Sequence, residues 1–295
     1  MNKLKVSHDR MNRLSSTYYF LTVSYYSSNF LEKLTETLPD LINLVVVNNS
    51  PDDNFNILTK QTNLKTSLII LESGENLGFG RGCNLGLQYI YDRHPQAIVW
   101  LINPDAYLKQ VDLQQLQNLF SKYPQLSILG TTIYEPKGCL WFGGGLFNRS
   151  LGLIQDVDYR SKLVDQDYEP CDWVSGCSLM INLKNFKACP QFDSTYFLYY
   201  EDFDFCQRYL ASGHTVGITD RCSVYHYPSS ITGRNLYFKF QHSTYSYLVT
   251  IQRYSSTTIL VLRLLRVIII ALIQLPYKPS ICAGKLVGIW KWLQA

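Results

Sequence analysis

Short apolar runs and amphipathic segments alternate over about the first 130 residues of the chain. Strands are predicted for the runs of β-branched, aromatic and aliphatic residues at 18–25, 44–47, 67–71 and 98–102. Helices are predicted where apolar residues recur at helical spacing, at 30–38, 84–91 and 111–120. Strands that alternate with helices predict an α/β fold with an open, mostly parallel sheet, in which ligands bind beyond the carboxyl ends of the strands.

Polar side chains gather at that edge of the predicted sheet. Asn48, Asn76 and Asn103 each follow a predicted strand, and Asn76 lies in the glycine-rich segment 75–84. Glycines let a main chain approach a ligand, and side-chain amides can hydrogen-bond to a nucleotide. Cys83 stands where a dinucleotide-binding fingerprint needs its third glycine, which argues against a dehydrogenase. The segment alone is equally compatible with a structural turn.

Asp105 comes directly after the predicted strand 98–102, in Asn103-Pro104-Asp105. A carboxylate in this place can bind a divalent cation that bridges two phosphates, whereas a lone aspartate after a strand can also cap a helix. The glycine-rich segment upstream favours the cation site. His226, in a run of strand-forming residues, is either a late metal ligand or a satisfied strand histidine, and the pattern does not decide between them.

Glu201 and Asp202 open a helix that is predicted to run to Leu210, and they follow the aromatic run 196–200. The dipole of a helix stabilises acidic residues in its first turn, which is one explanation of the pair. A carboxylate at the end of an aromatic wall is also suited to take a proton from a sugar hydroxyl. Before this helix the regular alternation loosens, and the segment 134–172 is predicted to form loops that face an acceptor.

The charge of the chain is uneven. Residues 221–295 contain five arginines, four lysines and no acidic residue, a charge of +9, so the first 220 residues carry −5 of the net +4. Such a basic segment suggests contact with the phosphates of lipid or nucleic acid. The apolar run 259–275 would form a helix about 25 Å long, against a bilayer core of about 30 Å.

Arg263 and Arg266 lie on one face of this predicted helix, which argues against a membrane span and predicts a helix that lies in the membrane interface. Trp290 and Trp292 would anchor it at head-group depth. A buried core helix or an oligomer helix is the alternative, and the long apolar run fits lipid better than nucleic acid. The eight cysteines show no CxxC pair and no apolar leader precedes the first strand, so free thiols and a cytoplasmic location are expected.

Five motifs in this order resemble family 2 glycosyltransferases of the rhamnosyltransferase-like branch, over roughly residues 18–232: 45–50, 75–84, 101–106, 173–177 and 199–208. The resemblance implies a GT-A fold, a nucleotide-sugar donor and an inverting single displacement. It also implies a role in bacterial surface polysaccharide (O-antigen) synthesis, with the protein peripheral to the cytoplasmic face of the membrane.

The resemblance also assigns roles to residues. Asp202, with Glu201 beside it, stands at the catalytic base, and Asp105 stands at the last carboxylate of the DxD motif that binds Mg²⁺ or Mn²⁺, with His226 as the metal-associated histidine. The donor is expected to contact Val23, Tyr25, Asn48, Asn76, Gly78, Phe79, Asn84, Asn103 and Asp105, and the acceptor to contact Trp173, Ser175 and Gly176. Asn48 and Asn103 replace carboxylates that the family often has, so metal binding would rest on one carboxylate.

The chain is accordingly expected to divide into an N-terminal extension (1–17), a catalytic domain (18–232, its donor half 18–133 and acceptor half 134–232) and a membrane-associating helical region (233–295). The expected donor is dTDP-rhamnose, with UDP-hexoses second, and the expected acceptor is a glycan or a lipid-linked glycan. Nucleic acid is not an expected partner, and the C-terminal helices could form an oligomer. The alternatives are a catalytically silent carbohydrate- or partner-binding protein on the same fold, and a sugar-phosphate nucleotidyltransferase, which would need a basic glycine-rich loop on the first strand.

Overall fold

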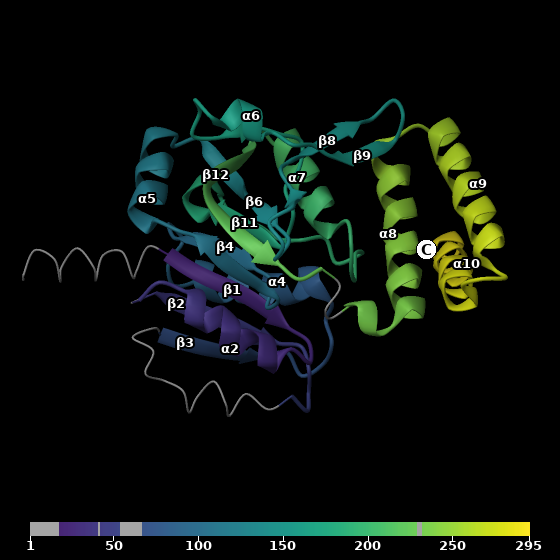
Figure 1. Cartoon of the computed structure of the whole chain (residues 1–295), viewed down its shortest axis with the longest axis horizontal. Helices are drawn as coiled ribbons and strands as arrows, with labels where there is room; N and C mark the ends of the chain where they lie inside the picture. Colours follow the sequence, from purple (N-terminus) through teal and green to yellow (C-terminus); the bar gives the residue numbers. More distant parts are fainter. Residues whose placement is uncertain (1–17, 41, 54–66, 229–231) are drawn as a thin grey trace, which may run out of the picture.

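The computed structural model describes residues 18–40, 42–53, 67–228 and 232–295. A ten-stranded mixed sheet forms the centre of the molecule, with the strand order β10-β12-β6-β11-β4-β1-β2-β3 (Figure 1). Strand β5 pairs with β12 and β7 pairs with β6. Helices cover both faces of the sheet, so the predicted α/β fold is confirmed.

Four parallel neighbours form one half of the sheet: β1 (Tyr18–Ser24), β2 (Asn43–Asn48), β3 (Ser67–Glu72) and β4 (Ile98–Ile102). Every residue of β1 and β4 is buried, as expected for strands covered on both faces. Ser24, Asn48 and Glu72 are paired in register at the ends of their strands. The carboxyl ends of these three strands therefore share one edge of the sheet, and Asn48 lies at this edge as the sequence predicts.

The other half of the sheet mixes directions. Strand β11 (Ser178–Asn182) lies antiparallel between β4 and β6 (Leu126–Tyr134), and β12 (Thr215–His226) runs parallel to β6. Strand β5 (Ala106–Gln110) pairs antiparallel with β12 and places Ala106 opposite His226. Asp105 thus precedes a strand, and the helix-cap explanation of this residue is wrong.

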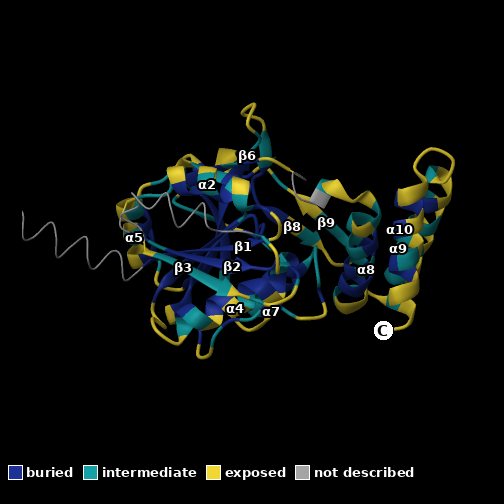
Figure 2. Cartoon of the chain, turned by 90° about the horizontal axis from the view of Figure 1, so that it is seen from below, coloured by how far each residue is buried: buried dark blue, intermediate teal, exposed yellow. Residues whose placement is uncertain are grey.

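Helix α2 (Ser28–Thr37) covers one face of the sheet, and α4 (Phe79–Tyr91) and α7 (Glu201–Ala211) cover the other (Figure 2). Helix α4 begins five residues before the prediction, with Gly78 as its N-cap, so most of the glycine-rich segment is helical. A Cβ at Gly82 would lie 2.8 Å from Val23 Cγ1, and one at Gly86 would overlap the Leu21 side chain. These two glycines bring α4 close to β1.

Smaller elements complete the body: α5 (Leu113–Lys122), β7 (Leu140–Phe142), β8 (Gly145–Asn148), β9 (Leu153–Asp156), α6 (Arg160–Leu163), β10 (Glu169–Pro170), and the 3₁₀ turns η1 (Leu183–Asn185) and η2 (Thr232–Arg234). Strands β8 and β9 form an antiparallel hairpin that reaches across the end of α8 towards the start of α9 (Figure 1). All eight cysteines are free thiols, as predicted.

Three C-terminal helices stand beside this body: α8 (Leu236–Tyr254), α9 (Thr257–Gln274) and α10 (Pro279–Leu293) (Figure 1). The sequence predicts residues 233–295 to be helical but does not define α8 as a separate helix, because its apolar residues are interleaved with tyrosines and polar residues. Gly284 and Gly288 of α10 face α8, and a Cβ on them would lie 2.5 Å from Tyr237 O and 2.6 Å from Gln241 O. The two helix backbones therefore approach closely through small residues.

Helix α9 is the exposed member of the three. Only 6% of its residues are buried, and in the described part of the chain it is the one helix long and apolar enough to cross a membrane by length and composition. Its outer stripe consists of Val261, Leu262, Leu265, Ile269, Leu272 and Ile273, each about half exposed or more. The alternative of a buried core helix is therefore wrong for this chain (Figure 2).

Candidate active site

The turn before β11 joins two of the predicted motifs. The main-chain N–H of Asn103 donates a hydrogen bond to Cys177 O at 2.9 Å, and the main-chain N–H of Gly176 donates to Asp202 Oδ2 at 2.8 Å. The Phe79 ring lies beside the same turn, because a Cβ at Gly176 would lie 3.0 Å from Phe79 Cε1 and 3.3 Å from Asp202 Cβ. Segments far apart in the sequence thus meet around Gly176, at the edge where the parallel strands end.

Asp202 is held in a fixed orientation at the start of α7. Its Oδ1 accepts a hydrogen bond from the Phe203 amide at 2.8 Å, while Oδ2 accepts from Gly176. Burial raises the pKa of Asp202, and these main-chain hydrogen bonds act in the opposite direction. A partly exposed carboxylate with a raised pKa is chemically suited to accept a proton near neutral pH.

Glu201 lies against α4. Its side chain is 5% exposed and lies towards α4, with its Cβ 3.6 Å from the position a Cβ would take on Gly80. Burial raises the pKa of Glu201 well above its ordinary value, and the charge of Asp202 adds to the shift. Of the two adjacent carboxylates, Asp202 is therefore the one beside Gly176 and Phe79.

Asp105 and His226 form a buried pair where β5 meets the end of β12. His226 Nε2 lies 3.5 Å from Asp105 Oδ1, and the side chains are only 7% and 5% exposed. Asp105 Oδ1 and His226 Nδ1 have no hydrogen-bond partner within the described residues. The Trp141 and His226 rings form a T-shaped pair, with 4.6 Å between ring centroids. One ring nitrogen of His226 therefore has no partner among the described residues.

This pair fits a divalent cation. A buried polar atom without a partner costs about 1–3 kcal/mol, and a cation would supply the missing partner of Asp105. Carboxylate oxygen and imidazole nitrogen are ligands that Mn²⁺ accepts, and two neighbouring ligands of an octahedral ion at about 2.1 Å lie about 3 Å apart. Among the described residues no group of three or more His, Cys, Asp and Glu side chains surrounds such a position. The protein would supply two ligands, and phosphate oxygens or water the others.

Asn48 is the last residue of β2, and its side-chain amide is hydrogen-bonded within the protein. Nδ2 donates to Glu72 Oε2 at 2.8 Å, and Oδ1 accepts from the Ser50 amide at 2.9 Å. Val23, in the neighbouring strand, is buried against α4, whereas Tyr25 is exposed at the rim. Of these predicted donor residues, Tyr25 is the one whose side chain presents an open surface.

The other two predicted amides organise the start of α4. Asn76 Oδ1 accepts from the Gly78 amide at 3.0 Å, and Asn84 pairs with the main chain of Phe192 through Nδ2 (2.9 Å) and Oδ1 (2.7 Å). Gly78 has φ +78°, and a Cβ there would overlap Phe197 O. These contacts fix the loop 192–197, and with it the approach to α7, against the glycine-rich segment.

The residues before Asp202 are strained. Tyr199 and Tyr200 both have left-handed backbone conformations, with φ +70° and +65°. Such a conformation costs a non-glycine residue about 1–2 kcal/mol and persists only where the surrounding structure enforces it. The Tyr200 ring packs on Tyr247 of α8, with 5.7 Å between centroids. The C-terminal helices thus contribute directly to the surroundings of Asp202.

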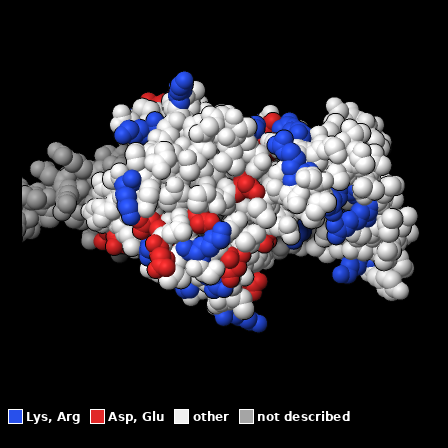
Figure 3. Space-filling model, turned by 90° about the horizontal axis from the view of Figure 1, so that it is seen from above, with Lys and Arg blue, Asp and Glu red and all other residues white. Residues whose placement is uncertain are grey.

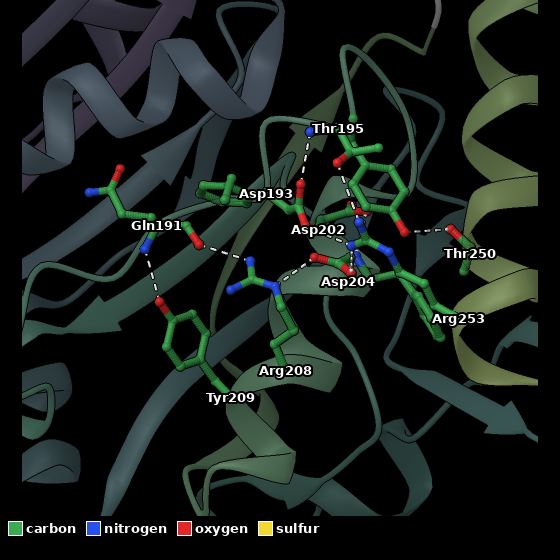
Figure 4. Close-up of polar contacts among 12 residues, drawn as sticks. Gln191, Asp193, Thr195, Asp202, Asp204, Arg208, Tyr209, Thr250 and Arg253 are labelled. Carbon is green, nitrogen blue, oxygen red and sulfur yellow. Dashed lines mark hydrogen bonds and ion pairs between the residues drawn. The ribbon is translucent and has the colours of Figure 1, made fainter. Parts of the chain in front are cut away.

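Asp204 ties α7 to α8 (Figure 4). The carboxylate is fully buried and accepts from Arg208 Nε at 2.7 Å, Arg253 Nη1 at 3.1 Å and Tyr254 Oη at 2.8 Å. Arg253 also pairs with Asp193 at 2.7 Å. Sequence reasoning missed this network, because Arg253 stands in a helix that no apolar periodicity predicted.

The predicted acceptor residues lie on the other side of the Gly176 turn. Trp173 packs in an aromatic cluster, with centroid distances of 4.9 Å to Phe142 and 6.2 Å to Phe203. Ser175 is buried, and its Oγ accepts from the Cys177 amide at 3.3 Å. The cluster supports the turn, so Gly176 is the member of this motif that reaches Asp202.

Two polar residues near the site carried no recognisable sequence signal. Burial raises the pKa of Asp156 in β9, and the nearby charge of Asp202 raises it further. Arg234 Nη1 donates to Tyr26 O at 2.9 Å and so lies at the rim beside Tyr25. Asp156 ends a short strand and Arg234 ends a 3₁₀ turn, and neither periodicity nor a motif distinguishes these residues in the sequence.

The model of glycosyl transferase family 2 matches residues 23–182. A low-salt glycan biosynthesis hexosyltransferase of Haloferax volcanii is 24% identical over 76% of this chain and 69% of its own length. An N-acetylglucosaminyl-diphospho-decaprenol L-rhamnosyltransferase of Mycobacterium tuberculosis is 26% identical over 56% of this chain and 61% of its own length. The chain therefore spans about two thirds of the length of these relatives.

The fold is also similar to that of a solved glycosyltransferase. A crystal structure of GalNAc-T7 with UDP, GalNAc and Mn²⁺ superposes with a TM-score of 0.57 and 11% identity, over 80% of this chain and 47% of that chain. At this identity the similarity concerns the fold alone.

Proposed function

The chain belongs to glycosyl transferase family 2, and from this premise we propose that it transfers a sugar from a nucleoside-diphosphate donor to a hydroxyl of a lipid-linked glycan, with inversion. The observation that carries the proposal is the turn at Gly176, which is bonded to Asp202 and, through Cys177, to the Asn103 motif. Rhamnosyl- and hexosyltransferase relatives support dTDP-rhamnose as the first donor and a UDP-hexose as the second.

Asp202 is the proposed base. Its carboxylate takes the proton of the acceptor hydroxyl, and the hydroxyl oxygen then attacks the anomeric carbon from the side opposite the leaving diphosphate. One displacement inverts the anomeric configuration. The two main-chain donors on Asp202 hold the carboxylate in place for this transfer, since both of its oxygens are fixed from the side of the protein.

Asp105 and His226 are the proposed holders of Mg²⁺ or Mn²⁺. The ion, when bound, would offset the negative charge that develops on the departing diphosphate. Phe79 lies against the same turn as Asp202, which supports its place between the donor sugar and the base. Asn48, Asn76 and Asn84 are proposed to shape the donor site through the main chain, because their amides are bonded within the protein.

The proposed membrane contact rests on α9. Its exposed apolar stripe would lie in the acyl region, and the basic C-terminal segment would meet the head groups on the cytoplasmic face. Ile269→Glu places a charge in the stripe, whereas Val164→Glu places one on an equally apolar side chain of the body that is 71% exposed. We expect only Ile269→Glu to reduce vesicle flotation. Equal flotation of both variants would exclude the stripe as the membrane contact.

A two-step experiment tests the enzymatic proposal. Thermal shift against a panel of nucleotide sugars, with and without Mn²⁺, identifies the donor, because a ligand of the folded state raises its melting temperature. Nucleoside diphosphate release with that donor is then compared for wild type and Asp202→Asn. General base catalysis contributes about 10²–10⁴-fold, so a loss of this size is expected with donor binding unchanged.

Glu201→Gln separates the two adjacent carboxylates. Because Glu201 faces α4, its replacement is expected to reduce turnover far less than Asp202→Asn. Near wild-type transfer by a folded Asp202→Asn variant that binds donor would refute the assignment of the base.

A further inference from the structure

Two arginines of α9 are not used by the proposed transfer mechanism. Arg263 and Arg266 are three residues apart, so their side chains leave the helix on neighbouring sides of one face. Arg263 Nε donates to Leu151 O at 3.2 Å, at the tip of the β8–β9 hairpin, and Nη2 donates to the same oxygen. Gly152 packs against Ile259, where a Cβ would lie 2.6 Å from Ile259 Cγ2. The hairpin thus holds this face of α9 towards the catalytic body.

Two tyrosines connect the arginines to Asp202. The Tyr247 ring of α8 packs on Tyr200, which stands two residues before Asp202. Helix α9, which carries the arginines, packs on α8, which carries Tyr247. Burial raises the pKa of Tyr247, and the charges of Arg263 and Arg266 lower it. Packing contacts thus lead from α9 through α8 and Tyr247 to Tyr200, which stands before Asp202.

Among the described residues, no carboxylate pairs with the two arginines. Neither guanidinium forms a salt bridge in the described part of the chain, and residues 221–295 contain no Asp or Glu. In Figure 3 the end of the molecule formed by the C-terminal helices shows Lys and Arg without acidic atoms. A guanidinium offers a planar fork of N–H donors that matches phosphate oxygens. The electrostatics therefore favour a phosphate as the missing counterion.

The exposed stripe of α9 indicates how deep Arg263 and Arg266 would lie in a membrane. Leu262, Leu265 and Ile269 lie on the outer side of the helix, and the exposed Arg266 lies at the edge of their stripe. When the stripe enters the acyl region, arginines at its edge reach head-group depth, where lipid phosphates lie.

We propose that Arg263 and Arg266 bind a phosphate of the acceptor, one that links the acceptor sugar to its lipid. This inference rests on the proposed transfer to a lipid-linked glycan and deepens it. With the sugar hydroxyl at Asp202, the sugar would lie along Tyr200 and Tyr247 and its phosphate would meet the arginine pair. The arginines are positioning residues, because they hold the acceptor and do not touch the atoms that react.

The test uses the full chain and three kinds of vesicle. One is made of phosphatidylcholine, one of phosphatidylcholine with a small fraction of a polyprenyl diphosphate, and one of phosphatidylcholine with phosphatidylglycerol at matched negative charge. Wild type is compared with the double variant Arg263→Gln/Arg266→Gln. The control is Lys278→Gln/Lys291→Gln, which removes the same charge from the same segment.

We expect wild type and the lysine control to prefer the diphosphate vesicles by about tenfold over the matched phosphatidylglycerol vesicles, which corresponds to about 1.4 kcal/mol. The arginine variant should lose this preference while keeping its melting temperature. A preference that persists in the arginine variant overturns the proposal. A preference lost equally in the lysine control overturns it too, since bulk attraction to head groups would then explain the binding.

The donor thermal shift separates this inference from the proposed function. A normal shift in the arginine variant, together with an unchanged vesicle preference, refutes only the phosphate site. A wild-type protein that shows no shift with any nucleotide sugar refutes the transfer function, whatever the vesicles show.

Discussion

Replacing Asp204 with asparagine tests whether the C-terminal helices hold the catalytic helix in place. The carboxylate is fully buried and accepts hydrogen bonds from two guanidinium groups and from Tyr254. Asparagine has one acceptor oxygen, and its NH₂ group would face a guanidinium that can only donate. The variant therefore loses the hydrogen bond from at least one guanidinium and leaves Arg208 and Arg253 without this carboxylate.

The expected cost follows from the burial of the partners. Breaking a buried ion pair by removing one partner costs about 3–5 kcal/mol. Arg208 and Arg253 are each about one third exposed, so water compensates part of their loss and the lower end, about 3 kcal/mol, is expected. With an m-value of about 3 kcal/mol/M, the urea midpoint should fall by about 1 M.

The matched control is Asp193→Asn, which removes the second carboxylate on Arg253. Asp193 is one quarter exposed, so its loss should cost about 1 kcal/mol. Urea unfolding followed by tryptophan fluorescence measures both variants, and a double-mutant cycle of Asp204→Asn with Arg253→Gln measures their coupling. Equal costs for Asp204→Asn and Asp193→Asn, or a coupling near zero, would refute the reasoning.

Three further predictions concern pH, glycine and metal. Burial alone would raise the pKa of Asp193, but its hydrogen bonds and the Arg253 charge lower it to about 2. This contribution to stability is complete above about pH 4 and is lost as the pH falls through 2. It should amount to about 1 kcal/mol for this partly exposed carboxylate, and acid titration of unfolding in wild type and Asp193→Asn measures it. Gly74 and Gly78 share a φ near +75°, but nothing lies within 4 Å of a Cβ at Gly74. Alanine should therefore destabilise the protein by about 1–2 kcal/mol at Gly74 and by at least about 1 kcal/mol more at Gly78, as measured by urea unfolding. Equal costs would exclude a tight contact at Gly78. His226→Ala should raise the Mn²⁺ concentration needed for half-maximal turnover by about tenfold or more, and an unchanged Mn²⁺ titration would remove this residue from the metal site.

The parallel half of the sheet could be predicted because its strands are continuous apolar runs that end in polar residues. The neighbourhood of Asp105 and Asp202 could be predicted only from the order of the motifs, since no periodicity places the Gly176 turn between them. The pairing of β5 with β12 was missed, because β5 is short and its partner lies more than 100 residues later. That pairing is what brings His226 to Asp105.

A sequence pattern does not predict which partner a side-chain amide will bond. Asn84 is a residue of a type that often binds ligands, yet its two side-chain hydrogen bonds go to the main chain of Phe192, 108 residues further along the chain. The same limit applies to the contacts that α8 makes with α7. Its contribution lies in Arg253, Tyr254 and Tyr247, which act on α7 across space and leave no local signal.

The exposed stripe of α9 has a kinetic consequence. An enzyme held at a lipid surface by this stripe meets a lipid-borne acceptor by lateral diffusion, so its rate depends on the number of acceptor molecules per unit area of membrane. Diluting the acceptor with inert lipid at constant bulk concentration would then slow transfer, whereas adding more vesicles of the same composition would not.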